Sequence, residues 1–346
     1  MSDQAFRDKP KIGLIRPSDS DWDRFVIGQP RAHLLQLSAW GALKSQFEWE
    51  RQIVALGRGD QIQAGALTLL KRLPLGLGKM AYAPMGGFAT DDAQYEMLWD
   101  AIRSQTGAAF IKLEPGHYAP GRAPELADMG FRQSPQTIQP PRTIVIDIAG
   151  EDEAILGRMN QGTRRKIRKS LKSGIEYFEG SRADISAFSR LMEQTGARNE
   201  FGVHNESYFE KVFELLLPKY GALLLARNKG DLLAAIMIFA LGDAAWYLYG
   251  ASSRGKGNLY ATYGIQWAAI QWAKQRGCRS YDLWGVPDHD EATLEAQFKE
   301  RRDGLWGVYG FKRGWGGEVR RSLGAWDKAF NPLVYAAYRA ALKLRS

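Results

Sequence analysis

Seven basic side chains lie within the short segment RMNQGTRRKIRKSLK. They are Arg158, Arg164, Arg165, Lys166, Arg168, Lys169 and Lys172. No acidic residue lies between Glu153 and Glu176, and Gly174 is typical of a residue that ends a helix. A basic helix can lie along a row of phosphates, and each contact adds salt-sensitive affinity. We therefore expect five of these residues to contact a polyanion, the alternative being a solvated helix face; they are Arg164, Arg165, Lys166, Arg168 and Lys169.

A second segment, Gly304–Gly317, reads GLWGVYGFKRGWGG and carries Lys312 directly after Phe311. Its glycines and tryptophans predict a strand and a turn against which a ligand or another backbone packs closely. A lysine in such surroundings is a candidate for catalysis, and a plain surface lysine is the alternative.

A third segment joins aromatic residues to a glycine-rich loop, YLYGASSRGKGNLYATYGIQW. Gly255–Gly257 lies between a predicted strand and a helix N-terminus, where backbone N–H groups can bind phosphate. An acetyl-CoA loop carries Gln or Arg where this chain has Ser252, so the loop is incomplete for that cofactor. Tyr249 and Tyr263 either line a cleft beside the loop or pack in the core.

The segment Ala32–Trp49 predicts an amphipathic helix with Ser38 as its N-cap. Its apolar stripe consists of Trp40, Leu43 and Phe47. Gln36 and Lys44 are the polar residues at the edges of this stripe. No Ser-His-Asp, Cys-His or paired-carboxylate pattern accompanies these motifs.

Length and composition bound the remaining possibilities. The 346 residues predict about two domains, and the net charge of +9 indicates a polyanionic partner. One cysteine, Cys278, and four histidines favour a reducing, cytoplasmic setting and argue against a dedicated metal centre. The first eleven residues are polar and charged, which does not predict a signal peptide. The apolar stretch Leu232–Ala251 is interrupted by Gly242-Asp243 and predicts two strands, not a membrane span.

An internal repeat organises these motifs. Two apolar hairpins have turns that end at Asp60 and Asp231, which are 171 residues apart. Each hairpin is followed by an aromatic strand, a helix and a closing strand, and the closing strands, around Ile111 and Asp282, are again 171 residues apart. Two α/β (α+β) domains are therefore expected, each with the element order of the GNAT acyltransferase fold and without a coiled-coil insertion. The predicted domains are 1–150 and 151–346, with the C-terminal segment packing back on the first.

At these residues the chain resembles the FemABX family, which comprises bacterial peptidyltransferases that move amino acids from aminoacyl-tRNA to peptidoglycan precursors. The motifs that carry the resemblance are LLQLSAWGALK, YAPMGGF, MNQGTRRKIRKSLKSGIEY, EQTGARNEFGVHNESYFE, YLYGASSRGKGNLYATYGIQWAAIQWAKQRGCRSYDLWGVP and GVYGFKRGWGGEVRRSLGAWD. They cover nearly the whole chain, which is similar to the short, FemX-like members. The family is built from two GNAT-like domains.

The resemblance implies roles for particular residues. Lys44, in the pattern WGxxK, and Arg198, in TxxR, would bind the phosphates of the precursor. Lys312 would lie at the acyl-transfer centre, with Tyr249 and Tyr263 as further catalytic candidates. The other candidates for substrate binding are Gln36, Trp40, Tyr82, Asn258 and Phe311. The family's Arg-Gly-Pro after the Tyr-x-Pro strand is replaced here by Met-Gly-Gly after Tyr82–Pro84, and the next acid is Asp91.

The resulting expectation is an aminoacyltransferase that uses aminoacyl-tRNA as co-substrate, with no cofactor and no metal. The acceptor would be the stem-peptide amine of a diphosphate-bearing peptidoglycan precursor, nucleotide-linked or lipid-linked. The expected location is cytoplasmic, with peripheral contact at the anionic inner face of the plasma membrane. Three alternatives stay open: a GNAT-fold acyltransferase, a tRNA-dependent peptide ligase with a non-cell-wall acceptor, and a non-catalytic tRNA-binding or membrane-surface protein.

Overall fold

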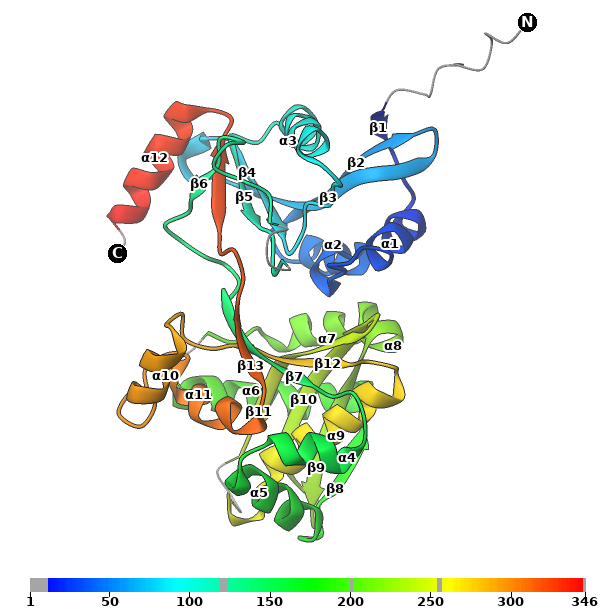
Figure 1. Cartoon of the computed structure of the whole chain (residues 1–346), viewed down its shortest axis with the longest axis vertical. Coiled ribbons are helices and arrows are strands. Elements are labelled where there is room, and N and C mark those ends of the chain that lie inside the picture. The colour runs from blue at the N-terminus through cyan, green and yellow to red at the C-terminus, as the bar shows by residue number, and fades with distance from the viewer. Residues whose placement is uncertain (1–11, 119–122, 200–201, 254–256, 345–346) are drawn as a thin grey trace, which may run out of the picture. The chain divides into compact units, whose positions relative to one another are not determined.

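The computed structural model describes residues 12–118, 123–199, 202–253 and 257–344. The chain divides into two units: unit 1 comprises residues 1–139 and 322–346, and unit 2 comprises residues 140–321 (Figure 1). Each unit holds one seven-stranded mixed sheet covered by helices, so the predicted pair of GNAT-like α/β domains is confirmed. None of the helices in these ranges is both long and apolar enough to cross a membrane.

Unit 1 has the strand order β1-β2-β3-β4-β5-β14-β6. The strands are β1 (Gly13–Ile15), β2 (Glu50–Arg58), β3 (Gln61–Arg72), β4 (Lys79–Pro84), β5 (Phe110–Glu114), β6 (Arg132–Gln133) and β14 (Trp326–Ala329). The helices are α1 (Asp19–Ile27), α2 (Ser38–Ser45), α3 (Asp92–Thr106) and α12 (Pro332–Lys343), with short 3-10 turns at Leu34–Gln36 and Pro74–Gly76. Figure 1 shows α3 on one side of the sheet and α1 and α2 on the other. The core under α3 joins Leu98, Trp99 and Ile102 to alternate residues of the strands.

Unit 2 has the strand order β13-β7-β12-β11-β10-β9-β8. The strands are β7 (Arg142–Asp147), β8 (Glu176–Glu179), β9 (Gly221–Asn228), β10 (Asp231–Leu241), β11 (Ala244–Ser252), β12 (Ser280–Gly285) and β13 (Glu318–Arg321). The helices are α4 (Asp152–Arg158), α5 (Gln161–Leu171), α6 (Ile185–Asn199), α7 (Glu206–Leu215), α8 (Leu217–Tyr220), α9 (Ala261–Gln275), α10 (Glu291–Gln297) and α11 (Trp306–Lys312), with 3-10 turns at Arg182–Asp184, Gly257–Leu259 and Arg313–Trp315.

The predicted repeat corresponds to one shared order of elements. The β2–β3 hairpin, β4, α3 and β5 of unit 1 match the β9–β10 hairpin, β11, α9 and β12 of unit 2. In both units the strands that flank the helix pair in parallel, as a right-handed crossover requires.

Three local expectations are corrected. The boundary at residue 150 lies too late, because β7 pairs with β12 and β13 and therefore belongs to unit 2. Gly304–Gly317 forms α11 and a 3-10 turn, not a strand. Close contact explains its last three glycines; a Cβ at Gly316, for example, would lie 2.1 Å from the carbonyl oxygen of Arg158. Ser38 begins α2 and donates its hydroxyl to Asp23 at 2.8 Å, so it is not the N-cap.

Candidate functional site

The two parallel strand pairs differ in their number of paired residues, which leaves an opening in the ladder of unit 2, meaning a stretch where β11 and β12 are not paired. In unit 1, β4 and β5 stay paired over five residues, up to Pro84 and Glu114 at their ends. In unit 2, β11 and β12 pair over three residues only, the last pair being Trp246 and Asp282. Beyond that pair β11 continues along β10, and β12 continues along β7. Backbone groups at the edges of parted strands can in general bind an extended ligand.

Lys312 lies at the β12 side of this opening. Its Nζ donates to the carbonyl oxygens of Trp284 at 3.2 Å and Gly285 at 2.7 Å, and its side chain is almost fully buried. An ammonium group has three N–H donors, so one remains for a ligand after these two bonds. Burial lowers the pKa of Lys312 from 10.5 to about 7, and the nearby Asp282 carboxylate partly opposes that shift. At neutral pH this amine can therefore both hold and release a proton.

Asp282 is held at the same strand end by local backbone geometry. Its carboxylate accepts hydrogen bonds from the Thr143 hydroxyl and, at 2.7 Å, from the backbone N–H of Trp284. Trp284 has a φ of 62°, a left-handed conformation that is costly for an aromatic residue, and it lies where the register of β12 against β7 shifts. Burial raises the pKa of Asp282 to about 6. A buried acid and a buried amine thus lie together where the strands part.

Three predicted residues gather on the α9 face of the same sheet. Tyr263, on α9, packs edge-on against Phe311 at 5.0 Å and accepts a hydrogen bond from Lys166 of α5 at 3.0 Å. Trp315 stacks on Tyr263 at 6.1 Å, so the aromatic group is continuous with the segment that carries Lys312.

Tyr249 belongs to a different cluster, on the face covered by α6 and α7. Its hydroxyl lies 3.0 Å from that of Tyr208, and its ring packs against Phe209 and Phe239. Burial raises its pKa to about 12. The sheet therefore separates Tyr249 from Tyr263, and the structure does not bring them together with Lys312 as one triad.

Arg198 and Thr195 hold the end of β11. Arg198 donates to the carbonyl oxygen of Ser252 at 3.0 Å, and the Thr195 hydroxyl accepts from the Ser252 N–H at 3.2 Å. Asn258 is exposed in the 3-10 turn that follows. Of the glycine-rich loop, Gly255 and Lys256 lie outside the described residues.

The basic segment forms two helices, not one, because Asn160 caps α5 by accepting from the Thr163 N–H at 2.7 Å. Arg165, Arg168 and Lys169 of α5 are exposed, as a polyanion contact requires. Arg164 instead donates to the carbonyl oxygen of Met159 at 2.5 Å, and Lys166 points to Tyr263. The outward charge of α5 thus comes from fewer residues than the sequence predicts.

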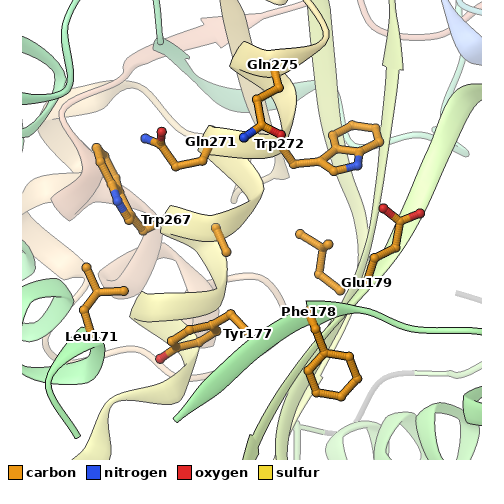
Figure 2. Close-up of a pocket in the computed structure, with 10 residues that line it drawn as sticks. Leu171, Tyr177, Phe178, Glu179, Trp267, Gln271, Trp272 and Gln275 are labelled. Atoms are coloured by element: carbon orange, nitrogen blue, oxygen red, sulfur yellow. The ribbon is translucent and has the colours of Figure 1, made fainter. Parts of the chain in front are cut away.

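A hollow of about 430 Å³ opens between α5, β8 and α9 on the same unit (Figure 2). Its walls are largely apolar and include Leu171, Phe178, Trp267 and Trp272. Lys312 does not line this hollow, which is therefore distinct from the opening between β11 and β12.

In unit 1, Lys44 lies on α2 with its ammonium 4.9 Å from the centre of the Trp40 ring, and burial lowers its pKa to about 8. Gln36, predicted to bind substrate, is fully buried. Its amide donates to the carbonyl oxygens of Leu67 and Pro84 at 3.2 and 2.8 Å and accepts from the Leu67 N–H. These bonds fasten the Leu34–Gln36 turn to β3 and β4, and a substrate contact by Gln36 stays a prediction.

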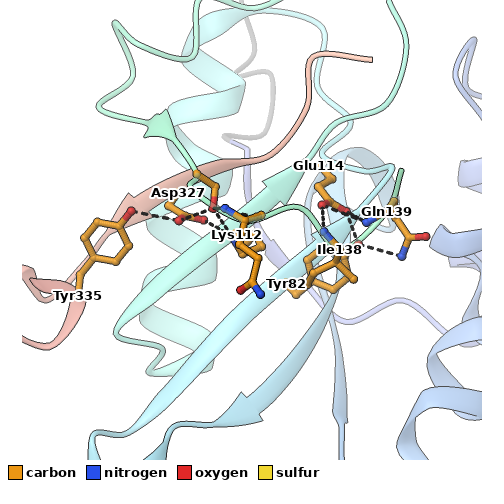
Figure 3. Close-up of polar contacts among 9 residues, drawn as sticks. Tyr82, Lys112, Glu114, Ile138, Gln139, Asp327 and Tyr335 are labelled. Carbon is orange, nitrogen blue, oxygen red and sulfur yellow. Dashed lines mark hydrogen bonds and ion pairs between the residues drawn. The ribbon is translucent and has the colours of Figure 1, made fainter. Parts of the chain in front are cut away.

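Tyr82 is also buried, and Figure 3 shows its hydroxyl pointing to Glu114 at the end of β5. That bond is 2.5 Å long, and Glu114 also accepts from the backbone N–H groups of Ile138 and Gln139. Burial raises the pKa of Glu114, and the bonds from Tyr82 and the backbone oppose that rise. The Tyr82 hydroxyl is therefore engaged by Glu114 in this structure, and its role in substrate binding stays a prediction.

A family model described as the FemAB family matches residues 129–229 and 223–343. The chain belongs to the FemAB family. It is 26% identical to a protein named lipid II:glycine glycyltransferase from Staphylococcus saprophyticus, over 92% of this chain and 93% of the relative. Its fold is similar to that in a crystal structure of FemX, with a TM-score of 0.84, 21% identity and coverage of 94% of this chain and 99% of that one. A tandem GNAT protein from the clavulanic acid biosynthesis pathway matches with a TM-score of 0.54 and 10% identity, over 92% of this chain and 98% of that one.

These comparisons confirm the predicted resemblance, the fold and the enzyme class, which is acyltransferase. The roles of individual residues in this FemAB-family chain stay predictions.

The sequence analysis missed two buried carboxylates, Glu114 and Asp282. Glu114 ends the strand FIKLE, and Asp282 is the third residue of the strand SYDLWG; each is the single acid of its strand. An isolated acid in an apolar strand is the signal that points to them, because a buried charge persists only when it is bonded or used.

Proposed function

We propose that this FemAB-family chain is an aminoacyltransferase that forms peptidoglycan bridges, with aminoacyl-tRNA as donor and a lipid-linked precursor as acceptor. The support for the acceptor is that the curated relatives are lipid II:glycine glycyltransferases. Glycine is accordingly the amino acid we expect to be transferred. The single structural observation that carries the proposal is the placement of Lys312 where β11 and β12 part.

The chemistry follows from an ester that is already activated, so we expect no cofactor. The stem-peptide amine attacks the ester carbonyl carbon, a C–N bond forms, and the C–O bond to the tRNA ribose breaks. The amine loses one proton, and the leaving ribose oxygen gains one. A third N–H of Lys312 can stabilise the developing oxyanion and then protonate the leaving oxygen, and the neutral amine so formed can take up the proton that the attacking amine releases, because its pKa of about 7 suits both transfers near neutral pH.

The remaining elements supply positioning. Backbone edges of β11 and β12 offer hydrogen bonds to an extended peptide or acceptor end. The exposed cations of α5 offer contacts to a tRNA backbone. Lys44 and Arg198 stay our candidates for contacts to the precursor's phosphates.

The test supplies the purified chain with a mixture of charged tRNAs and a lipid-linked precursor, and mass spectrometry reports the added mass. We expect the mass of glycine on the stem peptide. Lys312→Ala should lower turnover at least tenfold with little change in precursor affinity. The matched control is Lys274→Ala, which removes a half-buried lysine of unit 2 that pairs with Asp152 at 2.5 Å.

Retention of tRNA with its ester intact would identify a binding protein and overturn the proposal. Transfer only to a peptide from outside the cell wall would identify a ligase with a different acceptor.

A further inference from the structure

Helix α12 is firmly attached to unit 1 by one face. Tyr335 and Tyr338 pack against Phe110 of β5, with ring centres 5.2 and 4.7 Å away. The Tyr335 hydroxyl donates to Asp327 at 3.0 Å, and Asn331 caps the helix by accepting from the Val334 N–H. The helix is thus held by its own cap and by the core, and it lies at the outer side of unit 1 in Figure 1.

The opposite face of α12 is apolar and exposed. Leu333 is 84% exposed and Leu344 is 89% exposed, whereas each of the other large hydrophobic side chains that are exposed in the described residues is at most 51% exposed. Ala337 and Ala340 are exposed between them. Spacings of four, three and four residues place these four side chains in one stripe along a helix. An ordered helix that exposes two leucines on one stripe to water indicates a missing apolar partner.

The flank of this stripe is basic. Neither aspartate nor glutamate occurs from Asn331 to the end of the chain, and Arg339 and Lys343 are exposed on α12. Arg339 also lines a hollow of about 270 Å³ beside the helix, together with Arg132 of β6 and the buried Asp327. The Asp327 carboxylate is buried and bonded to Lys112 and Tyr335, whereas the exposed charged side chains of α12 itself, Arg339 and Lys343, are both basic.

A lipid surface fits these features better than a second copy of the chain. A twelve-residue helix is about 18 Å long, and a stripe of two leucines and two alanines covers far less than the roughly 800 Å² per partner of a stable dimer. Pairing two copies through this face would also bring their basic flanks together. We propose that α12 docks the chain on an anionic lipid surface, with Leu333 and Leu344 among the acyl chains and Arg339 and Lys343 at the headgroups.

This inference extends the proposed function to the place where it operates, but it can be tested without any transfer reaction. The full chain is sedimented with vesicles of phosphatidylglycerol and phosphatidylcholine, and with phosphatidylcholine alone. We expect binding to the anionic vesicles that falls at least tenfold in Leu333→Ser/Leu344→Ser. The matched control is Leu14→Ser/Ile27→Ser, which changes two exposed residues elsewhere in unit 1, 51% and 43% exposed. Arg339→Ala/Lys343→Ala should reduce both the binding and its salt dependence.

Equal vesicle binding by wild type and Leu333→Ser/Leu344→Ser, with unchanged circular dichroism, would overturn the inference. A wild-type dimer in analytical ultracentrifugation that becomes monomeric in this variant would assign the stripe to a second copy instead. Activity separates the two proposals: the variant should keep its rate on a precursor without lipid and lose rate on one embedded in vesicles. Absence of transfer in both arms would remove the proposed function and leave the vesicle result standing.

Discussion

Replacing Lys312 with methionine should abolish transfer activity and remove a pH-dependent contribution to the free energy of unfolding. The pKa of Lys312 falls from 10.5 in an unfolded chain to about 7 in the folded one. At about 1.4 kcal/mol per pKa unit, the protonated amine destabilises the folded state by up to about 5 kcal/mol below pH 7. Methionine has a similar length and no charge, so this penalty disappears in the variant.

The sign follows from proton binding. Between about pH 7 and 10.5 the unfolded chain holds a proton on Lys312 that the folded chain has released, so wild-type stability rises with pH in this window. From pH 7 to pH 9 the wild type should gain about 2 kcal/mol relative to Lys312→Met. The variant also leaves the carbonyl groups of Trp284 and Gly285 without their donor, at about 1–3 kcal/mol each, but this cost does not depend on pH. The pKa of Asp282 is about 6, so that group titrates mainly below the window.

The assay is urea unfolding followed by tryptophan fluorescence at pH 7, 8 and 9. Lys274→Met is the control for removal of a lysine that is only half-buried. Wild-type and Lys312→Met stability curves that run parallel from pH 7 to pH 9 would refute the burial argument. Full transfer activity in Lys312→Met would refute the catalytic role independently.

Three further predictions concern other cations. Burial lowers the pKa of Lys44 to about 8, so diphosphate binding measured by calorimetry should weaken as pH rises from 7 to 9. Lys44→Arg should remove this pH dependence. A pH dependence that persists in Lys44→Arg would exclude Lys44 from diphosphate binding. Lys112→Met leaves Asp327 buried without its ion pair and should destabilise unit 1 by about 3–5 kcal/mol in urea unfolding. The double variant Lys112→Met/Asp327→Leu should recover most of that loss. Equal stability of Lys112→Met and wild type would contradict the importance of the ion pair. Reversing the charge of the three exposed basic residues of α5, Arg165, Arg168 and Lys169, should reduce the salt dependence of tRNA binding in a filter-binding assay. An unchanged slope would make this face merely solvated.

The repeated fold was predictable because turns, helix caps and apolar periodicity are local signals. Asp91 caps α3 and Gly107 ends it in a left-handed conformation, as their residue types indicate. The domain boundary was less accessible, because nothing local in TIVID shows which of two sheets it joins. The segment around Lys312 was predicted as a strand and a turn for a related reason. In sequence, a glycine that permits close packing, such as Gly316 against Arg158, looks the same as a glycine of a turn.

The candidate site was predictable only in part. The sequence indicated Lys312, but its burial and its bonds to Trp284 and Gly285 depend on a strand some thirty residues away in the chain. The backbone bonds of Gln36 were not predictable, because a polar residue at a helix edge looks the same in sequence whether its amide contacts substrate or backbone. The two tyrosines were grouped because sequence spacing does not reveal that a sheet lies between Tyr249 and Tyr263.

The path of the C-terminal segment has a consequence for how the protein is made. β14 is inserted between β5 and β6, and the bond from Lys112 to Asp327 joins residues 215 positions apart (Figure 3). On the ribosome, unit 2 emerges complete before β14 does, whereas unit 1 waits with the edge of β5 unpaired and Lys112 without its carboxylate. Unit 2 should therefore fold first although it begins later in the sequence, and chains truncated before Trp326 should be handed to chaperones or proteases with one finished unit and one unfinished.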